Sequence, residues 1–374
     1  MLVDRSPNSI FFACENIHNF AFYDDLQEIC EDKGECIESK FSKKDYVGAL
    51  KLIVSEKGLN YSQYPKGLIK FHKYKTEIRT ATEEHLVEGA MYATSGKNVF
   101  VHFTVAPEHK YNFEKHLNEV IPIYEEKFDV KYHFELSTQK PKTDTIAVTP
   151  ENEPFRNEND DLVFRPGGHG SLIENLNDID ADIVFIKNID NVVTDRLKKA
   201  TARYKKLIAG VLIDNQEKIH KFLSKLETEK DIPETSITKI AGFAESNLNI
   251  YLPETFKELP KEEKIKILIA KLNRPIRVCG MVKNEDEPGG GPFWVANNLN
   301  EKSLQIVESS QFDFENKDQL KTFNTATHFN PVDLVCAIKD KDGNKYNLLD
   351  FINPETGFIA NKSVQGNDIK ALEH

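Results

Sequence analysis

Residues 164–193 read FRPGGHGSLIENLNDIDADIVFIKNIDNVV, and we expect this stretch to decide the fold. Three glycines precede a segment that is predicted to be helical, and the apolar run DIVFIK at 182–187 then ends in polar residues. Continuous apolar runs of this length are typical of strands in a parallel sheet that is covered on both faces. The stretch therefore predicts a glycine loop, a helix and a buried strand of an α/β protein.

The segments upstream and downstream extend this pattern. Helical periodicity occurs at 16–29, 43–55, 80–93 and 108–125, and strand-like runs occur at 98–105, 129–137, 275–282, 303–308 and 333–338. Residues 194–272 are rich in Lys and Glu and carry apolar stripes at helical spacing. We therefore expect an α/β fold with a mixed, mostly parallel, Rossmann-like sheet and a helical insertion.

The composition excludes several classes of protein. The 374 residues include 49 Lys and Arg against 60 Asp and Glu, which gives a net charge of −11. Such a chain is poorly suited to duplex DNA or an anionic membrane, so we expect neither partner. No apolar run approaches the roughly 20 residues of a membrane span, and the start lacks a signal peptide, so we expect a cytoplasmic protein. The five cysteines form no CxxC pair, which argues against a disulfide framework.

The glycine cluster at Gly167, Gly168 and Gly170 is the densest chemical signal. Glycines before a helix let backbone N–H groups approach a ligand, and a helix N-terminus favours anions. The alternative is a tight turn between a strand and a helix, and the glycines alone do not decide between the two.

Polar residues at the end of the apolar run give a second signal. Asn188, Asp190 and Asn191 follow the strand directly. Ligands of α/β proteins bind at the carboxyl ends of parallel strands, and a carboxylate there can hold Mg²⁺ together with waters and phosphates. The alternative is an Asx turn that ends the strand.

Two further segments could contact a ligand. Lys66, within YPKGLIKFH at 64–72, lies between a proline and a glycine and could neutralise phosphate, although a lone loop lysine is usually a solvated surface residue. The segment VKNEDEPGGGPFWV at 282–295 holds three consecutive glycines and the only tryptophan. It is either a loop that closes over a ligand or a flexible hairpin.

The order of these segments resembles the UDP-sugar pyrophosphorylases. The matching positions are Pro65 to Gly67, Phe103 with Thr104, Gln139 with Pro141, Pro166 to Gly170, and Asn188, Asp190 and Asn191. Nearly the whole chain also resembles an uncharacterised bacterial family that is classed as a domain of unknown function and is distantly related to those enzymes. The matching stretches are RPGGHGSLIENLNDIDADIVFIKNIDNVV, EEHLVEGA, EPGGGPFWV and THFNPVDLVC.

The resemblance implies a fold of the nucleotide-diphospho-sugar transferase type and a sugar-1-phosphate nucleotidyltransferase that uses a nucleoside triphosphate, expected to be UTP. It implies that Lys66 and Asp190 are catalytic and that Asp190 binds Mg²⁺. The nucleotide-binding residues that it implies are Thr104, Gln139, Gly167, Gly168, His169, Gly170 and Asn188. The expected substrate-binding residues are Gly289, Gly290, Gly291, Glu308 and Asn330.

The pattern along the chain, together with the resemblance, divides it into four expected regions. These are a helical N-terminal region at 1–60, a nucleotide-binding half of the core at 61–193, a helical insertion at 194–274, and the second half of the core with the sugar-binding region at 275–374.

Two segments of the pyrophosphorylases have no counterpart here. A glycine-rich G-x-G-T-R-type phosphate loop is absent upstream of Pro65, and Asp333 stands where those enzymes have a late lysine. We therefore expect a chain that is clipped at both ends relative to those enzymes, and its catalytic activity stays open. One alternative is a non-catalytic nucleotide-binding or assembly protein. Another is a metal hydrolase that uses His102, His109, His169 and His328.

Overall fold

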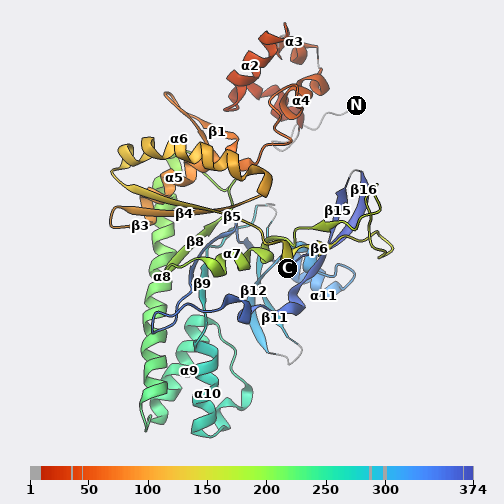
Figure 1. The fold of residues 1–374 in the computed structure, drawn as a ribbon. Helices are drawn as coiled ribbons and strands as arrows, with labels where there is room; N and C mark the ends of the chain where they lie inside the picture. The colour runs from red at the N-terminus through yellow and green to blue at the C-terminus, as the bar shows by residue number, and fades with distance from the viewer. Residues whose placement is uncertain are drawn as a thin grey trace. The chain divides into compact units, whose positions relative to one another are not determined.

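The computed structural model describes residues 10–34, 37–43, 45–285, 289–297, 301–364 and 366–373 (Figure 1). Its contacts divide the chain into two compact units. The first consists of Met1–Leu136 with Ile189–Ala202, and the second of Ser137–Asn188 with Arg203–His374. The four regions expected from the sequence stay predictions. Cys36 and residues 286–288 of the predicted triglycine loop lie outside the described residues.

The first unit contains helices and two small sheets. The helices are α1 (Ile10–Glu15), α2 (Tyr23–Asp32), α3 (Ile37–Ser42), α4 (Tyr46–Val54), α5 (Ala81–Tyr92) and α6 (Lys110–Phe128). The strands are β1 (Lys70–Lys73), β2 (Ile78–Thr80), β3 (Thr94–Ser95), β4 (Asn98–Val105) and β5 (Lys131–Thr138), which ends just inside the second unit. Strands β1 and β2 pair antiparallel, and β3, β4 and β5 form a sheet in that order.

Helix α5 begins where the sequence predicts. The Thr80 side chain accepts a hydrogen bond from the Glu83 backbone N–H, and the Glu83 side chain accepts one from the Thr80 N–H, which is a capping box. The apolar side chains of α5 and α6 pack with the buried residues of β4 in one core, which includes Leu86, Phe103 and Leu117. The expected helices and strand in this region are confirmed.

The second unit begins with short strands and a short helix. Its elements up to the helical region are β6 (Thr145–Ile146), β7 (Phe164–Arg165), α7 (Ile173–Asp178) and β8 (Ile183–Lys187). The strands after the helical region are β9 (Ile276–Cys279), β10 (Val282–Lys283), β11 (Gly291–Ala296), β12 (Lys302–Val307), β13 (His328–Phe329), β14 (Asp333–Ala337), β15 (Phe358–Val364) and β16 (Asn367–Glu373), with helix α11 (Lys317–Asn324) among them.

The sheets of the described residues differ from the expected single, mostly parallel sheet. The apolar strand β8 pairs with β14, and β14 also pairs with β9, and both pairings are antiparallel. The protein is therefore a mixed α/β chain with several sheets of two or three strands. An apolar run shows that a strand is buried, but it does not show which strand lies beside it or in which direction that strand runs.

Three helices fill the segment that is rich in Lys and Glu. Helix α8 (Asp195–Thr228) begins in the first unit and continues into the second, where α9 (Glu234–Leu248) and α10 (Lys261–Leu272) follow it. The lower part of α8 lies beside α9 and α10 (Figure 1). Fully buried Leu223, Ile237 and Leu268, one from each helix, lie in the largest apolar cluster that the structure describes. This cluster gives the helical region a core of its own.

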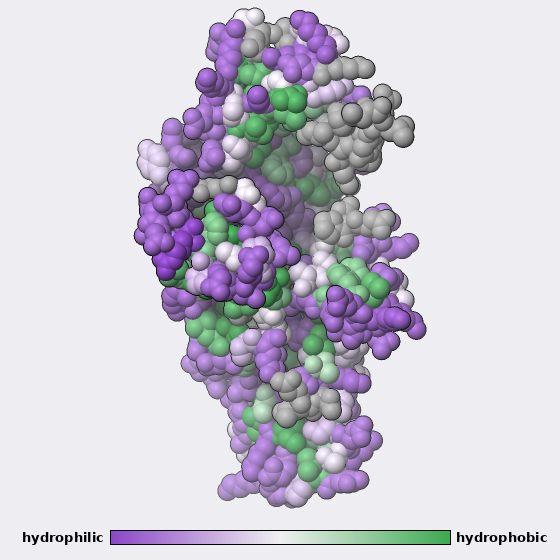
Figure 2. Space-filling view, turned by 90° about the vertical axis from the view of Figure 1, so that its right-hand side faces the viewer, coloured by the Kyte–Doolittle hydropathy of each residue, from purple (hydrophilic) through white to green (hydrophobic). Residues whose placement is uncertain are grey.

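Hydrophilic residues cover most of the face shown in Figure 2, with apolar patches between them. None of the described helices combines the length and the apolar character that crossing a bilayer requires.

The helical core makes a prediction about stability. Leu268 is fully buried on α10, so Leu268→Ala should lower the free energy of unfolding by about 2–5 kcal/mol because it leaves a cavity. Leu207 on α8 is 57% exposed, so Leu207→Ala should change it by less than about 0.5 kcal/mol. Urea unfolding followed by circular dichroism measures both variants, and equal losses would contradict this assignment of the core.

Candidate functional site

The two residues expected to be catalytic contact each other in the first unit. Lys66 Nζ lies 2.5 Å from Asp190 Oδ2, although 124 positions separate them in the sequence. Lys66 is 66% exposed and Asp190 is 37% exposed, so the pair faces solvent. Exposed ion pairs add little to the free energy of unfolding, so the stability of the fold does not depend on this contact.

The close packing of Gly67 fixes the position of the turn that carries Lys66. Residues Lys66–Leu68 form one turn of 3₁₀ helix that begins after Pro65. A Cβ at Gly67 would lie 2.5 Å from the Phe113 ring, and the buried Thr82 hydroxyl donates a hydrogen bond to the Gly67 carbonyl at 2.8 Å. Only glycine fits there, and the turn therefore holds the adjacent lysine at a fixed place on the surface.

Side chains of the same unit hold the turn that carries Asp190 by hydrogen bonds to Ile189, Val193 and Asp195. His85 Nε2 donates to the Ile189 carbonyl at 3.0 Å, and Lys198 Nζ donates to the Val193 carbonyl at 2.6 Å. Arg79 donates to both carboxylate oxygens of Asp195, at 2.6 and 3.0 Å, where α8 begins. The segment between these anchors presents the Asp190 carboxylate.

A buried ion network supplies the anchors. Glu84 on α5 has no exposure to solvent, and Arg79 and Lys198 are each 2% exposed. Lys198 Nζ lies 2.8 Å from a Glu84 oxygen, and the Tyr74 hydroxyl donates to the other oxygen at 2.6 Å. His72 Nδ1 also lies 2.8 Å from Glu84. The network joins β1, β2 and α5 to the first turn of α8.

The network keeps its carboxylates ionised. Burial opposes ionisation of Glu84, but hydrogen bonds from Lys198 and Tyr74 outweigh it, so the pKa of Glu84 lies below its usual value. Burial likewise opposes ionisation of Asp195, and the hydrogen bonds from Arg79 lower the pKa of that carboxyl. Lowered carboxyl pKa values stabilise the fold above the usual carboxyl range, and this contribution is lost as the pH falls through the folded-state values.

Three residues expected to bind the nucleotide line one pocket in the second unit. Gln139, Gly168 and His169 surround a space of about 320 Å³ together with Arg165, Pro166, Leu172, Lys362, Ala371 and Glu373. Gly168 has a φ of +80°, and a Cβ there would lie 3.1 Å from atoms of the Glu373 side chain. The glycine thus allows both the turn and the close approach of the β15–β16 hairpin.

The other glycines of this loop do not line that pocket. A Cβ at Gly167 would lie 2.6 Å from the Thr143 carbonyl oxygen, so Gly167 permits a close backbone approach. Gly170 lies in the 3₁₀ turn His169–Leu172, which leads into the six-residue helix α7. The expected anion site at a helix N-terminus stays a prediction.

The expected substrate residues make close contacts within the protein itself. Asn330 is 3% exposed, and its amide donates to the Gly280 carbonyl at 2.7 Å and accepts from the Val332 N–H at 2.9 Å. The Gly290 carbonyl accepts a hydrogen bond from the Asn330 N–H.

The three glycines and Glu308 are also engaged by neighbouring residues. A Cβ at Gly290 would lie 2.4 Å from Ile306, and Glu308 forms a reciprocal cap with Gln311. Gly289 and Gly291 are equally crowded, by the rings of Phe329 and Phe293.

The remaining expected residues are not brought together within one unit. Thr104 is exposed on β4 in the first unit, and Asn188 follows β8 in the second. Within the described residues, no three His, Cys, Asp or Glu side chains gather as a metal site. The alternative of a histidine-based metal hydrolase therefore gains no support from the four histidines named for it.

Sequence reasoning missed the residues that fix the site. No motif in the sequence singles out Arg79 or Lys198, and Glu84 and His85 appear there only within the stretch EEHLVEGA. Glu84 and Glu88 are four residues apart, so they share one face of α5, and both are buried. Two acidic residues on the apolar face of a helix were the signal in the sequence, but their partner Lys198 lies more than a hundred positions away.

Removing the cation of this network should destabilise the first unit. Lys198→Met removes the ammonium that pairs with the buried Glu84 carboxylate. We therefore expect the free energy of unfolding to fall by about 3–5 kcal/mol. Lys199→Met changes the exposed neighbour on the same helix and should cost less than about 0.5 kcal/mol. Urea unfolding compares the two, and a Lys198 variant as stable as the Lys199 variant would show that the network is dispensable.

Comparisons with known proteins place the chain in a family. A comparison with curated proteins found no match. Among solved structures, the chain is similar to a mutant UDP-glucose pyrophosphorylase from Leishmania major in complex with UDP-glucose, at 12% identity and a TM-score of 0.40, over 82% of this chain and 54% of that chain. The chain thus spans about half of that enzyme. The family described as Domain of unknown function (DUF4301) matches residues 5–374, so the chain belongs to this family.

Proposed function

We propose that the chain is a sugar-1-phosphate nucleotidyltransferase of the UDP-sugar pyrophosphorylase type, with UTP and a sugar 1-phosphate as substrates. In this reaction a phosphate oxygen of the sugar 1-phosphate attacks the α-phosphorus of the triphosphate. The bond between the α- and β-phosphates breaks, and pyrophosphate leaves. The nucleophile is already an anion, so the protein's task is to position the reactants and to neutralise charge.

The contact between Lys66 and Asp190 carries this proposal. It places an ammonium and a carboxylate side by side on the surface of the first unit, each held by a rigid support. An ammonium is a suitable point charge for a phosphate, and it would compensate the charge that develops in the transition state. The Asp190 charge then orients Lys66 until the substrate phosphates arrive.

The donor set at Asp190 fits Mg²⁺. This ion prefers oxygen ligands and is commonly held by one or two carboxylates, with waters and substrate phosphates completing its shell. Among the residues that the structure describes, no group of three metal ligands surrounds Asp190, and its carboxylate is exposed. When bound, the ion would neutralise the α-phosphate, while Asp190 would hold it and Lys66 would contact the phosphates.

The pocket of the second unit supports nucleotide binding. Gly168 leaves room beside the backbone, Gln139 brings an amide, and His169 brings a ring that can stack or form hydrogen bonds. Amides and backbone groups distinguish bases by their edges, so these residues would hold the uracil. The same pocket would also serve the alternative, a non-catalytic nucleotide-binding protein, because its residues would bind the base and take no part in the transfer.

Nucleotide binding is the first test. Calorimetric titration should show that UTP binds more tightly than ATP, and His169→Ala should weaken UTP binding up to about tenfold through the loss of ring contacts. His18→Ala removes an exposed histidine outside the pocket and should leave the affinity unchanged. Absence of heat with UTP, UDP-glucose and ATP would refute both the transferase and the nucleotide-binding alternative.

Catalysis is the second test. With UTP, glucose 1-phosphate and Mg²⁺, pyrophosphate release should fall by about 10²–10³ in Asp190→Asn, which keeps the shape of the side chain but removes its charge. Asp32→Asn, at an exposed position on α2, should retain the parent rate. Circular dichroism of both variants should match the parent. UTP binding by the parent without turnover would instead identify a non-catalytic nucleotide-binding protein.

A further inference from the structure

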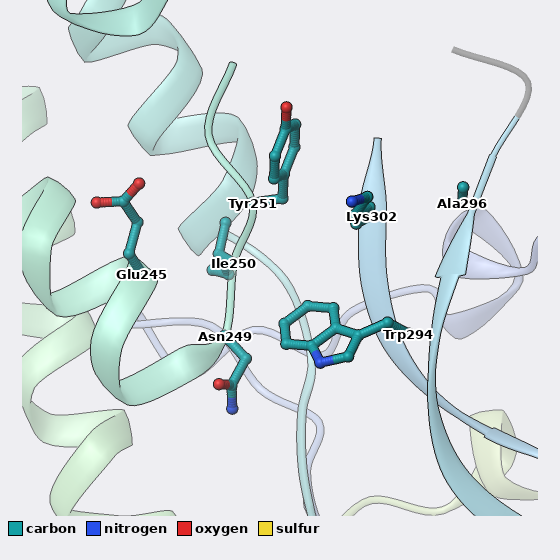
Figure 3. Close-up of a pocket in the computed structure, with 7 residues that line it drawn as sticks. All are labelled: Glu245, Asn249, Ile250, Tyr251, Trp294, Ala296 and Lys302. Carbon is teal, nitrogen blue, oxygen red and sulfur yellow. The ribbon is translucent and has the colours of Figure 1, made fainter. Parts of the chain in front are cut away.

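The second unit has another pocket, which shares no lining residue with the pocket at Gly168. It has a volume of about 540 Å³ and lies between the end of α9 and the β11–β12 hairpin (Figure 3). Its lining residues are Glu245, Asn249, Ile250, Tyr251, Trp294, Ala296 and Lys302. The volume is within the range of small-molecule sites. None of the residues assigned to the nucleotidyltransferase proposal takes part.

The alternation of β11 directs its one tryptophan into this pocket. Successive side chains of a strand point to opposite faces. Phe293 packs against Phe312 with ring centroids 4.9 Å apart, so the next residue, Trp294, faces the other way. Trp294 is 58% exposed, and in Figure 3 its ring extends toward Asn249 and Ile250. An indole is costly to leave in water, and this one has a free face over the pocket.

Polar groups of every hydrogen-bonding type surround the indole. Lys302 and the indole N–H only donate, the Glu245 carboxylate only accepts, and Asn249 and Tyr251 can do both. Figure 3 shows Tyr251 and Lys302 on one side of the indole and Asn249 on the other. Within the part of the chain that the structure describes, none of these five side chains has a hydrogen-bonding or ionic partner.

We propose that this pocket binds a neutral saccharide. The C–H face of a sugar ring packs on an aromatic face, and each hydroxyl both donates and accepts, so hydroxyls satisfy acceptors and donors alike. Lys302 and Glu245 carry opposite charges, so the lining has no net charge that would select a cation or an anion. A ligand that combines an apolar face with uncharged hydroxyl groups matches the whole set.

The single tryptophan of the chain makes the test direct, because its emission reports on Trp294 alone. The parent protein is titrated with maltose, cellobiose and chitobiose, and at least one should shift the emission in a saturable way. Calorimetry with that sugar should then show binding that is about tenfold weaker or more in Trp294→Ala, and weaker in Lys302→Met.

Matched controls make the outcome decisive. Tyr111→Ala removes another aromatic side chain, 74% exposed on α6, and should leave sugar binding unchanged. Circular dichroism should show that all variants are folded. The proposal would be overturned by a response to tetramethylammonium but to none of the sugars, or by no response to any probe. It would also be overturned by sugar binding that persists in Trp294→Ala. The test involves neither UTP nor Asp190, so its result is independent of the nucleotidyltransferase proposal.

Discussion

The carboxylate of Glu84, enclosed between β2, α5 and the first turn of α8, is the constraint on which the first unit depends. A charge without access to water is stable only where cations and hydrogen-bond donors replace its hydration. Arg79, Lys198 and Tyr74 fill this role, and each is also tied to another part of the chain. The electrostatic requirement of one side chain therefore fixes where residues 193–198 lie against the earlier part of the sequence.

The proposed chemistry depends on this constraint in a specific way. Asp190 is itself exposed, and the backbone on either side of it is anchored, which fixes the place of the residue. Lys66 is positioned in the same indirect manner, through the crowded Gly67. In the proposed reaction, this rigid support would let Lys66 contact a phosphate and Asp190 hold a metal ion, in place of their mutual ion pair, without a change in the fold.

The candidate site could be predicted where the signal is local, and could not where it depends on distant segments. Gln139, Gly168 and His169 were expected to act together, and they line one pocket. The resemblance also suggested that Asn330 contacts a sugar, yet its amide is occupied by the backbone around Gly280 and Val332. Trp294 was noted only as part of a loop, because the partners that make its pocket come from the end of a helix more than forty residues earlier.

The sequence by itself determined the local elements. The Thr80 cap, the apolar run of β8 and the helical stripes of 194–272 each act over a few residues, where backbone geometry and periodicity are sufficient. Only the tertiary structure decided the pairing of strands and the meeting of Lys66 with Asp190. The free energy of those contacts comes from groups that are far apart in the chain, and a buried charge such as Glu84 acquires its partners only when the fold is complete.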